Sequence, residues 1–172
     1  MDENKENKDK DLKQNQNQEQ AQEQAQEQQE KPKNVNTGLI SLEMVARMNN
    51  VNIDMRGVVR EYGISTADIS PEEIMRIAKN QGFKVKKKRL KLADYPERYP
   101  LPAIIQLKDN SYIVLLAIKR EEEKALTIAP LEKQPSVHTI AELQEMIKDE
   151  ILVIRHKMLN TDVKFGFKWF FI

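Results

Sequence analysis

Apolar and polar positions are strongly patterned in the middle of the chain. Two nearly continuous apolar runs, Pro102–Leu107 and Tyr112–Ile118, are separated by the polar residues Lys108–Ser111. Asp109 and Asn110 within this break tolerate the left-handed backbone of a tight turn, so the pattern predicts a β-hairpin. Because neither run alternates with polar residues, we expect both strands to lie inside a sheet that is covered on both faces.

Three helices are predicted before this hairpin. Apolar residues at helical spacing in Leu39–Ala46 indicate the first, with Asn36 or Thr37 available as its N-cap. The second is expected over Met55–Tyr62 and is closed by the glycine that follows. The third is the clearest, because Ser70–Glu73 combines a capping box with a proline at the first helical position.

Further strands are predicted on either side of the hairpin. Phe83–Leu92 alternates apolar and basic residues, as a strand with one solvent-facing side does. Another short strand is predicted over Lys124–Ala129. A capping box at Thr139 precedes a helix whose last apolar residue is Ile147, and Glu150–Arg155 follows as the final strand. The order of three helices, four strands, one helix and one strand is typical of an α+β domain.

The beginning of the chain differs from the rest in composition. Residues 1–34 are dominated by Gln, Glu, Asn and Lys and contain very few apolar side chains. We expect this segment to be a disordered tail that precedes a domain over residues 35–156. The tail carries nine acidic and six basic side chains, so the whole-chain charge of +1 leaves +4 for residues 35–172. That excess is too small to indicate nucleic-acid binding by itself.

The residue inventory argues against several classes of function. Without cysteine the chain has no disulfide framework, thiolate metal site or cysteine nucleophile. The N-terminus is too polar for a signal peptide, and no apolar run reaches the roughly 18 residues of a membrane-spanning helix. His138 and His156, the two histidines, lack the partners of a metal or catalytic site. We therefore expect neither a metal nor a cofactor in this fragment.

Five landmarks along the chain resemble a known family. The segments Asn36–Asn49, Gln81–Val85, Leu101–Ile105, Tyr112–Leu115 and Ala129–Pro130 follow the order and spacing of the papain-like peptidase domain at the N-terminus of bacteriocin-exporting ABC transporters. Members of that family cleave leader peptides after a double glycine. The resemblance implies a papain-like cysteine-peptidase fold, in which N-terminal helices pack on an antiparallel sheet.

The positions that carry the chemistry in that family hold different residues here. Its cysteine nucleophile, histidine base and orienting aspartate correspond to Thr37, Ser111 and Ala129, and its oxyanion glutamine corresponds to Lys31. A thiol protease needs a sulfur whose proton an adjacent imidazole removes. A threonine hydroxyl titrates far above neutral pH, and a serine offers no base. The resemblance therefore implies a degenerate peptidase domain, which is not an enzyme.

A non-cutting version of the domain occurs in type I secretion ABC transporters that export RTX-type proteins. Similarity to it implies a docking module for the unfolded secreted substrate, at the cytoplasmic face of the bacterial inner membrane. Its other partners would be the transporter's membrane and ATP-binding domains, and no nucleic acid is expected. Residues 157–172 would form a linker leading towards the transmembrane region. The candidate substrate-contacting residues are Thr37, Met44, Met48, Gln106 and Tyr112.

Simpler roles and other functions stay open at this point. Thr37 also suits a helix cap, Ser111 a turn, and Met44 and Met48 a core. The basic stretch Lys84–Lys91 suits a solvated strand face, but it also allows a winged-helix domain that binds nucleic acid, or a face that rests near anionic lipid. A working protease with an unusual nucleophile is the third functional hypothesis.

Overall fold

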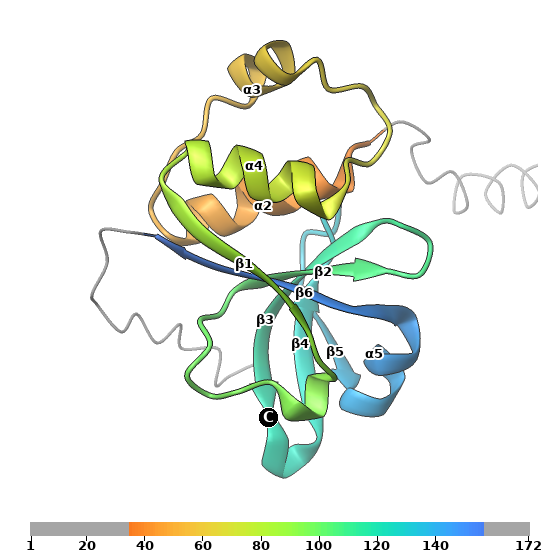
Figure 1. Cartoon of the computed structure of the whole chain (residues 1–172). Helices are drawn as coiled ribbons and strands as arrows, with labels where there is room; N and C mark the ends of the chain where they lie inside the picture. The colour runs from red at the N-terminus through yellow and green to blue at the C-terminus, as the bar shows by residue number, and fades with distance from the viewer. Residues whose placement is uncertain (1–34, 157–172) are drawn as a thin grey trace, which may run out of the picture. The chain divides into compact units, whose positions relative to one another are not determined.

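The computed structural model describes residues 35–156. The predicted tail, Lys31 and the predicted linker lie outside the described residues. The elements, in chain order, are α2 (Thr37–Met48), α3 (Met55–Tyr62), α4 (Pro71–Asn80), β1 (Phe83–Arg89), the 3-10 helix η1 (Leu92–Asp94), β2 (Ala103–Leu107), β3 (Tyr112–Lys119), the 3-10 helix η2 (Arg120–Glu122), β4 (Lys124–Ile128), β5 (Ser136–Thr139), α5 (Ile140–Met146) and β6 (Ile147–His156) (Figure 1).

The first three of these helices begin and end at local sequence signals. Asn36 caps α2 by accepting a hydrogen bond from the backbone N–H of Leu39 at 2.9 Å. Gly63 ends α3 with a left-handed backbone (φ 60°), which glycine adopts without steric cost. Ser70 and Glu73 make both hydrogen bonds of the capping box at the start of α4. The three predicted helices are therefore confirmed.

The six strands form one antiparallel sheet in the order β1-β6-β2-β3-β4-β5. The predicted hairpin is present as β2 and β3, and Asn110 in its turn has a left-handed backbone (φ 70°). Both strands lie in the middle of the sheet. Strand β6 is inserted between β1 and β2, so the last strand of the domain runs beside two earlier ones (Figure 1).

The C-terminal half departs from the sequence prediction in two places. Strand β5 is unpredicted, because its polar residues show no strand pattern; it forms by pairing with β4, where His138 lies opposite Ala125. The spacing of apolar residues predicts Ile147 as the last turn of a helix, but it begins β6. There Ile147 is 2% exposed and pairs with Leu107, so burial in the sheet outweighs the helical pattern.

Apolar side chains pack on both faces of the sheet. Along β3, Tyr112 and Val114 belong to the core beneath α2 and α4, whereas Ile113 and Leu115 belong to a second core beneath η1 and α5. This alternation explains why the strand is apolar at nearly every position, and it confirms the predicted burial on both sides. The winged-helix alternative finds no support, because its hairpin forms the centre of a six-stranded sheet.

Helix α2 lies close to β3 at Gly38. A Cβ atom added there would lie 2.9 Å from Cδ1 of Ile74 and 3.0 Å from Cδ2 of Tyr112. The missing side chain thus lets the tyrosine ring lie against the helix. Ser41, one turn further on, is fully buried, and its hydroxyl has no hydrogen-bond partner within the described part of the chain.

Alanine substitutions at Gly38 and Ser41 should differ in their effect on stability. Gly38→Ala should lower the free energy of unfolding by about 1 to 3 kcal/mol, because overpacking against the ring outweighs the better helix propensity of alanine. Ser41→Ala, the control in the same helix, should leave stability unchanged or raise it by up to about 1 kcal/mol, since the lost hydroxyl has no partner. Urea denaturation followed by circular dichroism measures both. A Gly38→Ala variant as stable as Ser41→Ala would contradict the close approach.

Candidate functional site

Thr37, the first residue of α2, contacts the start of β3. Its Oγ1 donates a hydrogen bond to Oδ1 of Asp68 at 2.7 Å and accepts one from the backbone N–H of Tyr112 at 2.8 Å. That amide joins Ser111 to Tyr112, so Thr37 and Ser111, the predicted counterparts of the nucleophile and the base, lie next to each other. Asp68 also accepts a hydrogen bond from the N–H of Gly38 at 3.1 Å. The threonine hydroxyl therefore links helix, loop and strand.

Ser111 and Ala129 lie at the same end of the β3–β4 ladder. Ser111 directly precedes β3, and its N–H and hydroxyl both donate to Oδ1 of Asp109, at 2.9 and 2.5 Å. Ala129 directly follows β4, whose last residue, Ile128, pairs with Val114. Neither side chain takes up or releases a proton near neutral pH. The topology thus brings Ser111 and Ala129, the predicted counterparts of the base and the acid, to one region, and neither side chain titrates near neutral pH.

A buried polar network extends from this region beneath the helices. The hydroxyl of Tyr112 donates to the carbonyl of Ile69 at 2.7 Å and accepts from Nε2 of Gln106 at 3.1 Å. Tyr112 is 1% exposed and Gln106 9%. Burial, and after it the nearby Asp68 carboxylate, raises the pKa of Tyr112, so its hydroxyl stays a donor at neutral pH. Both residues have structural partners, and substrate contact by either one stays a prediction.

Helix α2 also carries the two methionines that the sequence suggested as substrate contacts. Met44 and Met48 lie one turn apart, are half-buried, and pack against the core beneath the helices. Their sulfur atoms suit a core as well as an adaptable surface. Contact with a substrate therefore stays a prediction for these residues too.

The two histidines lie apart from this region. His138 is in the edge strand β5, and His156, the last residue of β6, packs edge-on against Phe83 with ring centroids 5.3 Å apart. Among residues 35–156, no three His, Cys, Asp or Glu side chains are placed to hold a metal ion. Nor is any helix in that range both long and apolar enough to cross a bilayer.

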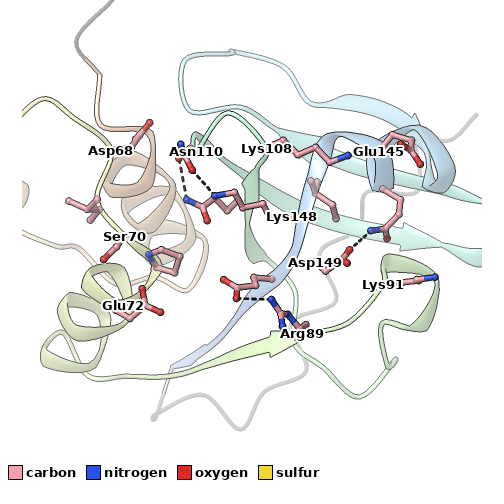
Figure 2. Close-up of a pocket in the computed structure, with 16 residues that line it drawn as sticks. Asp68, Ser70, Glu72, Arg89, Lys91, Lys108, Asn110, Glu145, Lys148 and Asp149 are labelled. Carbon is pink, nitrogen blue, oxygen red and sulfur yellow. Dashed lines mark hydrogen bonds and ion pairs between the residues drawn. The ribbon is translucent and has the colours of Figure 1, made fainter.

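An open groove of about 1160 Å³ lies beside the Thr37–Asp68 contact (Figure 2). The loop that leads into α4 forms one wall, and the β2–β3 turn and the α5–β6 junction form the other. The end of β1 completes the lining. The labelled residues in Figure 2 are Asp68, Ser70, Glu72, Arg89, Lys91, Lys108, Asn110, Glu145, Lys148 and Asp149.

Contacts between elements hold several of these groups in place. Nζ of Lys148 donates to Oδ1 of Asn110 at 2.6 Å, which ties β6 to the hairpin turn. The ammonium group of Lys87 lies 2.6 Å from Glu72 and holds the pKa of that carboxyl below its usual value. The side chain of Lys108 forms no ion pair with any described residue. The groove thus offers amides and charges of both signs, which suit an extended polypeptide.

Sequence reasoning missed Asp68 and the groove. Asp68 lies 31 residues from Thr37 in the chain and precedes a helix cap in a loop, so no local pattern indicates its role. Asn110 was predicted as a turn residue, but its contact with Lys148 spans 38 residues. That contact exists because β6 returns to the middle of the sheet, and no short-range signal predicts that return.

Two solved structures share this fold. The N-terminal peptidase C39 like domain of the toxin secretion ATP-binding protein from Vibrio parahaemolyticus has a TM-score of 0.63 at 23% identity, covering 71% of this chain and 98% of that one. A double glycine motif protease from an AMS/PCAT transporter, in complex with a leader peptide, has a TM-score of 0.60 at 21% identity, covering 69% and 82%. The α+β fold that the resemblance implied is confirmed.

Sequence comparison gives the same relationship. The leukotoxin export ATP-binding protein of Aggregatibacter actinomycetemcomitans is 27% identical over 140 residues, which are 80% of this chain and 20% of the relative. The chain spans about a fifth of the length of the curated relatives it matches. Residues 24–158 match the Peptidase C39 family. Because this match covers most of the chain and the fold agrees with it, the protein belongs to the Peptidase C39 family.

Proposed function

We propose that this chain is a non-catalytic C39 domain of a type I secretion ABC exporter, and that it docks an unfolded RTX-type substrate protein for export. One observation supports the proposal: the peptidase fold is present, and the residues that the resemblance matches to its catalytic positions, Thr37, Ser111 and Ala129, include no acid–base pair. The Thr37 hydroxyl already donates to Asp68 and accepts from the Tyr112 amide. Ser111 and Ala129 supply neither an imidazole nor a carboxylate.

The relatives support the exporter context. One is a leukotoxin export ATP-binding protein, and a structurally similar domain belongs to a toxin secretion ATP-binding protein. On this proposal the chain works with the membrane and nucleotide-binding domains of a transporter at the cytoplasmic face of the bacterial inner membrane. The nucleotide-binding domain would bind ATP, and the C39 domain itself would need no cofactor.

The groove beside the Thr37–Asp68 contact is the face where we place the substrate. An unfolded chain carries backbone N–H and C=O groups that have no internal partner, whereas a folded protein has paired most of them. The groove lining presents carboxylates, amides and the ammonium groups of Lys108 and Lys148 to such groups. Preference for unfolded over folded substrate follows from this difference.

If Thr37 serves structure, its hydroxyl should matter for stability. Thr37→Val keeps the shape but leaves the Tyr112 N–H without its acceptor, so the free energy of unfolding should fall by about 1 to 3 kcal/mol. Thr37→Ser retains the hydroxyl and is the control, with a loss well below that of valine. Urea denaturation compares the two variants. Equal losses for valine and serine would show that the hydroxyl does not hold these elements together.

The absence of proteolysis can be tested directly. Double-glycine leader peptides incubated with the purified chain should yield no more product than with a Thr37→Ala variant, as detected by mass spectrometry. In a well-studied serine protease, removing the triad lowers turnover by about 10⁶. Cleavage by the wild type that Thr37→Ala abolishes would instead support a protease with an unusual nucleophile.

Docking should depend on the folding state of the substrate. RTX repeats form a β-helix that binds calcium, and because metal binding is coupled to folding, calcium is used to switch the segment from its unfolded to its folded form. In an NMR titration of the ¹⁵N-labelled chain, the unfolded form should shift the signals of groove residues, including Lys108 and Lys148, and the folded form should not. Equal affinity for both forms would reject the docking function.

The position of the groove is tested by paired charge reversals. Lys108→Glu with Lys148→Glu should raise the Kd for the unfolded segment at least about tenfold. Arg60→Glu with Lys79→Glu makes the same change in net charge on exposed helix positions and should have little effect. Unaltered binding by the groove variant would show that the substrate docks on another face, while leaving docking itself intact.

A further inference from the structure

One face of β1 carries a line of cations. In this strand, alternate positions are occupied by Lys84, Lys86 and Lys88, so these three side chains project from the same side of the sheet. Lys84 lies directly opposite Arg155 in the β1–β6 ladder. Arg98 reaches the same region, because it and Lys88 both contact the ring of Tyr99, at 5.7 and 5.8 Å from the centroid. We call this set the basic row: Lys84, Lys86, Lys88, Arg98 and Arg155.

The basic row is not neutralised by the described residues. Asp94 and Glu97 are the acids in the neighbouring loop, and neither forms an ion pair with any member of the row. The opposite face of β1 is different, because Lys87 and Arg89 both lie within 4.0 Å of Glu150. Like charges placed directly opposite in an antiparallel ladder destabilise it, and the row contains one such pair. An anionic partner would relieve this repulsion.

Protection of a sheet edge explains only part of the row. Lysines on an edge strand discourage pairing with another chain, and β1 is an edge strand. Arg155, however, is on the interior strand β6, and Arg98 is in a loop. Alternate residues of a strand are about 7 Å apart, so the lysines form a straight line of charge about 14 Å long. Such a line suits an extended anionic surface.

The basic row begins where the chain leaves the sheet. Phe83 and His156 pair at the start of β1 and the end of β6, beside Lys84 (Figure 1). The sequence that follows, residues 157–172, contains lysines and a densely aromatic end. Aromatic residues are enriched at the interface between membrane and water, whereas binding to a nucleic-acid duplex through its phosphates needs none. The aromatic residues are Phe165, Phe167, Trp169, Phe170 and Phe171.

From the geometry and charge of these residues we infer that the basic row binds the surface of a bilayer that contains anionic lipid. Each lysine or arginine near such a surface strengthens binding about fivefold. The groove is lined by Arg89 and Glu150, which belong to the other face of β1 and β6. A lipid-bound domain would therefore keep its groove open, and the inference does not depend on the docking function.

Vesicle sedimentation with the full chain tests this inference. The chain should bind vesicles with about one-third phosphatidylglycerol, bind weakly to pure phosphatidylcholine, and dissociate at high salt because exposed charges are screened. The variant Lys84→Gln/Lys86→Gln/Arg155→Gln should lower the partition coefficient about 100-fold. Arg60→Gln/Lys79→Gln/Lys133→Gln removes the same charge elsewhere and should lower it only a few-fold.

The inference is wrong if the row variant binds vesicles as tightly as the wild type, or if the two triple variants lose vesicle affinity equally. It is also wrong if the chain binds duplex DNA or RNA through the basic row but does not bind vesicles. Circular dichroism checks that each variant folds. If the row variant does not fold, the single variant Lys84→Gln decides, with an expected loss of about fivefold. Titration of the row variant with unfolded substrate should match the wild type, so either proposal can fail without the other.

Discussion

The contact between the start of α2 and the start of β3 holds the helical layer on the sheet. Tyr112 makes this contact in three ways: its amide donates to Thr37, its hydroxyl donates to the carbonyl of Ile69, and its ring lies against Gly38. Each hydrogen bond has a modest net value of about 1 kcal/mol. Losing one would cost more, because it would leave a buried polar group without a partner. The three contacts together set where the helices sit on the sheet.

On the correspondence that the resemblance implies, the same contact occupies the place where a C39 peptidase would carry out its chemistry. A catalytic hydroxyl must be free to pass its proton to a base and attack a carbonyl carbon. Here the proton of Thr37 is donated to Asp68, and a lone pair accepts the Tyr112 amide. Packing and catalysis make competing demands on this one side chain, and the observed geometry meets the demand of packing. The adjoining groove is then available for recognition.

The two faces of β1 differ in their electrostatics, and this difference gives the domain two surfaces. Towards the groove, Lys87 is compensated by Glu72 and Glu150, so that face presents both signs of charge. On the other face the basic row is uncompensated within the described residues. On the two proposals made above, one small domain receives an unfolded chain on one face while it rests on a bilayer with the other.

Local sequence alone determined the helices and the central hairpin. Caps such as Ser70, the turn at Asn110 and the apolar runs of β2 and β3 act between residues a few positions apart, so they can be recognised in the chain itself. The spacing of landmarks also indicated the family. Only the tertiary structure decided the insertion of β6, the strand role of Ile147 and the bond from Thr37 to Asp68. These three features depend on burying every face of the sheet at once. Because this burial brings together residues 30 or more positions apart, no local pattern in the sequence indicates them.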